Sequence, residues 1–60
     1  MLIDDVTHWR KRADETRALV SHLTVPETRR VMLGLADSYD RLAEQLAARI
    51  AREAGQFGDR

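Results

Sequence analysis

Apolar and small side chains recur in alternating steps of three and four residues on both sides of the single proline, Pro26. Before Pro26 this stripe consists of Leu2, Val6, Trp9, Ala13, Thr16, Val20 and Leu23. After it come Met32, Ala36, Tyr39, Ala43, Leu46 and Ile50. The spacing is typical of a coiled-coil-like seam along an α-helix. We therefore expect an all-α fold, a two-helix antiparallel hairpin with helices at about 5–23 and 27–54.

Local signals indicate the ends of the first helix. The short carboxylate of Asp4 or Asp5 suits its start, because it can accept hydrogen bonds from free backbone amides at the positive end of the helix dipole. Pro26 disfavours helical geometry at Val25 and cannot donate a backbone hydrogen bond. The first helix should therefore end just before this proline.

The second helix has its own start and stop signals. Thr24 and Glu27 have the spacing of a capping box, in which each side chain binds the backbone amide of the other residue. Gly55 is a typical C-terminal stop. We therefore expect a short flexible tail at about 55–60, within a single domain that spans 1–60.

Folding the chain back at its middle brings the two seams face to face. Trp9 then lies opposite Tyr39 and Ala43, where the small alanine leaves room for the indole. At one edge of the seam, Arg10 should form an ion pair with Asp40. The residues expected in the hairpin core are Val6, Trp9, Ala13, Val20, Met32, Tyr39, Ala43 and Leu46.

A second apolar edge lies beside the seam, and a lone hairpin has no further element to cover it. The chain has 60 residues and no cysteine, so neither a large core nor a disulfide can stabilise it. We expect a homo-oligomer, with a two-fold dimer that forms an antiparallel four-helix bundle favoured over a different protein partner. The residues expected at the oligomer interface are Leu19, Val31, Leu35, Leu42 and Ile50.

The overall charge gives no reason to expect a polyanionic partner. Ten basic and ten acidic residues cancel, so no global field attracts nucleic acid or an anionic membrane. No apolar run approaches the ~20 residues of a bilayer span, and the acidic start does not resemble a secretory signal. The lack of cysteine is compatible with a reducing compartment. We therefore expect a cytoplasmic protein without membrane contact.

A nucleic-acid-binding accessory protein is the alternative function. Arg10, Lys11 and Arg12 form a basic cluster, and Arg17 follows it. Phosphate contacts require little more than clustered cations. We give this alternative less weight, because two acidic residues follow the cluster closely and a hairpin lacks the third helix of a helix-turn-helix fold.

The sequence offers little for catalysis or metal binding. His8 and His22 are separated by about 21 Å along one helix, too far to share a metal ion. The carboxylates Asp37, Asp40 and Glu44 lack the Glu-x-x-His element of di-metal bundles. Neither a glycine-rich phosphate loop nor a nucleophile with a paired base occurs. We therefore expect no enzyme and no cofactor, but an interaction or scaffolding module that acts through helix packing.

Short motifs are spread over roughly residues 8–47. They are His8-Trp9-Arg10, Arg12-Ala13-Asp14-Glu15-Thr16-Arg17, Pro26-Glu27, Met32-Leu33, Ala36-Asp37, Tyr39-Asp40 and Leu42-Ala43. Together they resemble a group of short uncharacterised bacterial helical-hairpin proteins. That group has no assigned activity, cofactor or catalytic residue, so the resemblance implies a hairpin alone. One departure is Val25, which stands where an acidic residue would precede the proline, and it weakens the case for a Thr24 cap.

Overall fold

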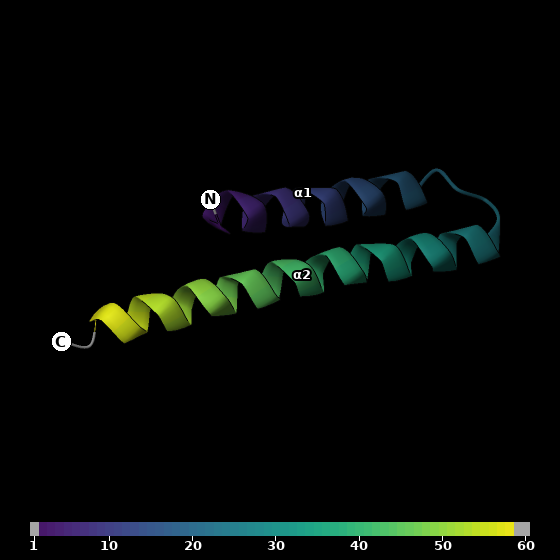
Figure 1. Cartoon of the computed structure of the whole chain (residues 1–60). Coiled ribbons are helices and arrows are strands. Elements are labelled where there is room, and N and C mark those ends of the chain that lie inside the picture. The colour runs from purple at the N-terminus through teal and green to yellow at the C-terminus, as the bar shows by residue number, and fades with distance from the viewer. Residues whose placement is uncertain (1, 59–60) are drawn as a thin grey trace.

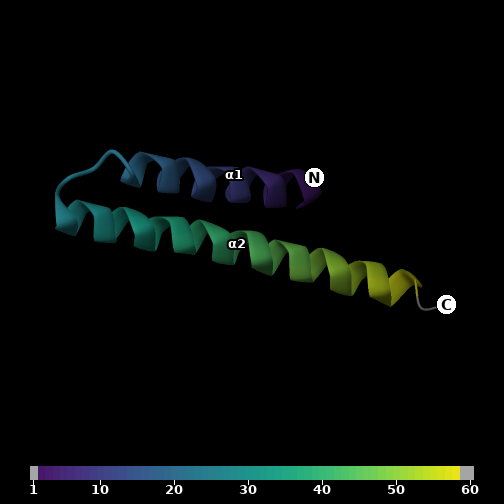
Figure 2. The same cartoon turned by 180° about the vertical axis from the view of Figure 1, so that it is seen from behind.

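The computed structural model describes the backbone of residues 2–58 and the side chains of residues 4–55. Helix α1 spans Leu2–Val20 and helix α2 spans Pro26–Gly58. The two helices lie side by side and antiparallel, and α2 extends well beyond the N-terminal end of α1 (Figure 1). The view from behind shows the same arrangement (Figure 2), and the molecule measures 54 × 15 × 12 Å. The expected all-α hairpin is confirmed.

Helix α1 begins and ends about three residues earlier than expected. Asp4 and Asp5 therefore lie inside its first turn, where they still suit the helix dipole, and do not cap it from outside. At the other end, the backbone amide of His22 donates a 3.0 Å hydrogen bond to the carbonyl oxygen of Leu19. This three-residue bond tightens the last turn. The helix thus ends in a turn several residues before the proline.

Helix α2 begins at Pro26, one residue before its expected start. The carbonyl oxygen of Val25 accepts a 3.0 Å hydrogen bond from the backbone amide of Arg29, so Val25 occupies the capping position. The capping box expected of Thr24 and Glu27 is therefore wrong by one residue. Proline suits the first helical position, because no backbone partner awaits its missing amide proton there and its fixed φ is already helical.

Helix α2 continues to Gly58, four residues beyond its expected end. A glycine stop requires the left-handed conformation, and no glycine among the described residues has a positive φ. In the helical conformation, Gly55 costs only about 1 kcal/mol relative to alanine. The expected flexible tail is therefore wrong for residues 55–58, and residues 59–60 lie outside the described part of the chain.

Small side chains form the contact between the helices. Ala13 of α1 and Ala36 of α2 have no exposed surface, and Ala43 is 1% exposed. Val6 and Val20 extend this buried seam toward the two ends of α1. Because these side chains are short, the two helix backbones can approach each other closely. The hairpin is held by one thin layer of close contacts.

The larger seam residues are only partly covered. The half-buried members of the expected core are Trp9, Met32, Tyr39 and Leu46. They project past the edge of the seam, and a two-helix fold has no second layer to cover them. The expected core list lacks Ala36 and Thr16, which the structure buries; the Thr16 hydroxyl donates a 2.8 Å hydrogen bond to the backbone carbonyl of Arg12. The side chain of Leu2, the first seam residue, lies outside the described part.

Candidate interaction surface

One long side of the hairpin carries a cluster of ion pairs. The guanidinium group of Arg17 on α1 donates hydrogen bonds to the carboxylates of Asp37, at 3.2 Å, and Asp40, both on α2. A third carboxylate, that of Asp14, lies 4.0 Å from the same guanidinium. We call this side, defined by Asp14, Arg17, Asp37 and Asp40, the charged flank. It edges the seam with polar groups that remain in contact with water.

The expected ion pair between Arg10 and Asp40 is wrong, because Asp40 pairs with Arg17. Arg10 and Arg17 are seven residues apart and therefore lie on the same side of α1, two turns from each other. Arg17 reaches two carboxylates from one position, whereas Arg10 lies beside Ala47 and Ile50. The sequence indicates the correct flank but not the correct turn.

The charged flank leads to a prediction about stability. The hydrogen bond to Asp40, more than any other contact, raises the pKa of Arg17 above its ordinary value. Such a contact stabilises the fold below the ordinary pKa and is lost only as the pH rises through the higher folded value. We therefore expect Arg17→Gln to lower the Tm by similar amounts at neutral and moderately alkaline pH, and by less in high salt, which screens exposed pairs.

Thermal circular dichroism at low and high salt measures this effect. Arg41→Gln, which changes an exposed arginine elsewhere on α2, is the matched control. An Arg17→Gln variant with the same Tm as the parent would show that the charged flank contributes nothing to the fold.

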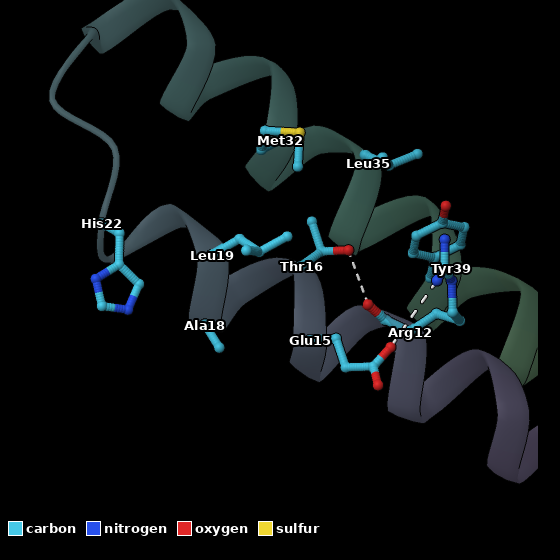
Figure 3. Close-up of a pocket in the computed structure, with 9 residues that line it drawn as sticks. All are labelled: Arg12, Glu15, Thr16, Ala18, Leu19, His22, Met32, Leu35 and Tyr39. Atoms are coloured by element: carbon cyan, nitrogen blue, oxygen red, sulfur yellow. Dashed lines mark hydrogen bonds and ion pairs between the residues drawn. The ribbon is translucent and has the colours of Figure 1, made fainter.

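An apolar groove occupies the opposite side of the hairpin. It has a volume of about 490 Å³ and lies between the two helices (Figure 3). Leu19 of α1 and Met32 of α2 extend into the space between the ribbons, and Leu35 of α2 lies at the edge. The polar side chains at its rim are Arg12, Glu15 and His22. The groove is therefore mainly apolar, with mixed charges along α1.

Aromatic rings fix one end of the groove. The rings of Trp9 and Tyr39 stack with their centroids 5.5 Å apart, as the expected register requires, and thereby join α1 to α2. The rings of His8 and Trp9 form a T-shaped contact with their centroids 4.8 Å apart. The guanidinium carbon of Arg12 lies 5.6 Å from the centre of the Tyr39 ring, and the same guanidinium pairs with Glu15 at 3.9 Å. Tyr39 is thus held in place from two directions.

Four of the five residues expected at an oligomer interface lie on the groove side. Their exposed fractions are 56% for Leu19, 69% for Val31, 39% for Leu35 and 40% for Leu42. Leu19 and Leu35 line the groove itself, and helix geometry places Val31 and Leu42 on the same side of α2. The fifth, Ile50, lies apart from them, half-buried in a second depression.

The sequence pattern places Thr16 and Met32 in the seam between the helices, but it does not indicate that they and Glu15 also line a groove. Glu15 and Thr16 precede Leu19 by four and three residues, and Met32 precedes Leu35 by three residues. Side chains at this spacing are neighbours on a helix surface. The same rule, applied to Leu19 and Leu35, would have indicated this.

The basic cluster does not form a single face. Successive helix positions point about 100° apart, so Arg10, Lys11 and Arg12 point in three directions. Arg12 lies at the groove, and Arg17 is held by the carboxylates of the charged flank. The four cations therefore present no continuous row to a phosphate backbone.

The described residues hold no other assembled site. No group of three or more histidine, cysteine, aspartate or glutamate side chains among them is placed to hold a metal ion. Neither helix, over the part of the chain that the structure describes, combines the length and apolar character needed to cross a membrane. No protein-family model, curated protein or solved structure matches the chain.

Proposed function

We propose that this protein is a non-catalytic protein–protein interaction module that assembles with a second copy of itself through the apolar groove. The observation that carries the proposal is the contrast between the two sides. Leu19, Leu35 and Leu42 are exposed on the groove side, whereas ion pairs between the helices make up the charged flank. A contiguous apolar surface on a small protein marks an interaction site.

The order of residues along α2 suits a four-helix bundle. Leu35 and Leu42 each directly precede a buried alanine, Ala36 and Ala43. Because consecutive positions on a helix point about 100° apart, α2 presents one stripe to α1 and a second stripe about a right angle away. A helix at the corner of a four-helix bundle contacts two neighbours in this way.

Energetics also favour assembly. A single core in a chain of 60 residues contributes roughly 3–5 kcal/mol. Full burial of one leucine contributes about 1.5–3 kcal/mol, and Leu19, Leu35 and Leu42 each keep about two-fifths or more of their surface exposed. Covering these leucines in two copies at once would add stabilisation comparable with that of the hairpin core itself.

Other roles receive less support. A nucleic-acid-binding role would rest on Arg10, Lys11 and Arg12, which point in different directions.

We infer a cytoplasmic location, since a chain without cysteine suits a reducing compartment.

The experiment that tests the proposal is a measurement of solution mass by light scattering across a concentration series, with helix content followed by circular dichroism in the same samples. We expect twice the monomer mass at high concentration and a loss of helicity as dilution separates the copies. A fully helical monomer at every concentration would overturn self-assembly and leave the groove to a different protein. Retention of DNA or RNA that weakens with salt would favour the basic cluster.

A further inference from the structure

Four apolar residues on the groove side of α2, namely Val31, Leu35, Leu42 and Leu46, are arranged symmetrically about the point between Ser38 and Tyr39. Leu35 is three residues before Ser38, and Leu42 is three residues after Tyr39. Val31 is seven residues before Ser38, and half-buried Leu46 is seven residues after Tyr39. These four positions therefore have the same spacing in both directions along the helix. A surface of this kind is complementary to a copy of itself that runs the opposite way.

We propose that the second copy docks with its α2 antiparallel on α2, about a two-fold axis that passes between Ser38 and Tyr39. This inference rests on the proposed self-assembly and adds its geometry. Each Leu35 then meets Leu42 of the second copy, and each Val31 meets Leu46 of the second copy. The leucines contact one another from both sides of the axis, as a two-fold interface requires.

The charges on either side of these four apolar residues match this arrangement. Glu27 is eleven residues before Ser38, and Arg49 is ten residues after Tyr39. The axis therefore brings Glu27 of each copy within one residue of the level of Arg49 of the other, and Arg52 lies less than one turn further along. Opposite charges meet at both ends of the apolar contact. Such pairs fix register and orientation more than they add affinity.

The polar rim on α1 matches it as well. The same axis passes α1 close to Arg12, because the guanidinium of Arg12 lies 5.6 Å from the Tyr39 ring. The two copies of α1 then lie side by side and antiparallel, so Arg12 and Glu15 follow each other in opposite directions along the two helices. Each Arg12 can face Glu15 of the second copy, and each Glu15 can face Arg12 of the second copy. Both helices thus meet their own copies with complementary side chains.

The charged flank limits the assembly to a closed pair. With the groove sides joined, Arg17, Asp37 and Asp40 face outward on both copies. A two-fold contact uses the same surface on each partner and leaves no second apolar side for further addition. The expected product is a dimer and not a growing filament.

The absence of cysteine from the chain allows a direct test. We would prepare Leu35→Cys and Leu42→Cys as separate full-length variants and oxidise each alone and as an equal mixture. A disulfide forms only when two cysteines come within about 7 Å between Cα atoms. We expect the mixture to give several-fold more cross-linked dimer than either variant alone, with the bond joining position 35 to position 42.

A control variant, a second mixture and the mass of the parent chain distinguish the proposed axis from other arrangements. Leu33 is about as exposed as Leu35 but lies toward the charged flank, so Leu33→Cys should not cross-link. A mixture of Leu19→Cys with Leu35→Cys tests a two-fold axis parallel to the helices, because both residues edge the same groove. Preferential cross-linking of this second mixture, or of Leu35→Cys with itself, in a protein of dimer mass would overturn the proposed axis while self-assembly stands. A monomer mass for the parent chain would overturn both proposals.

Discussion

The double variant Leu35→Glu and Leu42→Glu is expected to convert the proposed dimer into monomers, with a dissociation constant raised by at least about 100-fold. Each copy loses two apolar contacts worth about 1.5–3 kcal/mol when fully buried. Four carboxylates would also face an apolar contact in which they lack partners, which is strongly unfavourable. Sedimentation or light scattering at matched concentrations measures the change.

The hairpin itself provides the matched control for this experiment. Leu33 is 42% exposed, close to the 39% of Leu35, and lies on the same helix toward the charged flank. Leu33→Glu should therefore leave the dimer mass unchanged. If Leu33→Glu separated the copies as well as the double variant does, the effect would come from α2 as a whole and not from the groove.

Much of the fold follows from periodicity alone. The three-and-four spacing places Val6, Ala13 and Val20 on one face of α1 and Ala43 on the facing side of α2, and these side chains are buried. The spacing also places Trp9 opposite Tyr39, where the rings stack. Periodicity fixes which face is buried, because the angle between successive side chains on a helix is the same wherever the helix begins or ends.

The helix ends do not follow, because several signals compete at each one. Thr24 has the spacing of a capping residue, but Pro26 suits the first helical position and makes Val25 the cap. Gly55 resembles a stop, yet the alanine-rich turn before it favours continued helix. Free-energy differences of about 1 kcal/mol between alternative ends decide where each helix begins and ends. These differences depend on neighbouring residues in the fold, which the sequence pattern does not describe.

The candidate surface was only partly predictable for a related reason. A stripe on one helix indicates the side on which Leu19 or Leu35 lies. A groove, however, depends on how the two helices are aligned along their length. Ile50 fits the pattern but lies opposite the N-terminal part of α1, away from Leu35. The pairing of Asp40 with Arg17 instead of Arg10 has the same origin, since one flank contains both arginines and the register selects between them.

Ala36→Leu is expected to disrupt the hairpin more than any other single apolar substitution in α2. Ala36 has no exposed surface, and it belongs to the same thin seam as Ala13, whose side chain is also completely buried. Three additional carbon atoms at this position must push the helices apart, and overpacking of this kind typically costs 1–3 kcal/mol or somewhat more. A core of roughly 3–5 kcal/mol has little reserve. At about 4–8 °C per kcal/mol for a small domain, the Tm should fall by roughly 10–20 °C.

The control is Ala48→Leu, an exposed position on the same helix. Leucine and alanine have similar helix propensities, so Ala48→Leu should leave the Tm nearly unchanged, and the comparison isolates packing from propensity. Thermal circular dichroism of both variants is sufficient. If Ala36→Leu unfolded at the same temperature as Ala48→Leu, the helices could not be held by close contact between alanines. The half-buried rings of Trp9 and Tyr39 would then be the main contact between α1 and α2, and truncating Trp9 should have the larger effect.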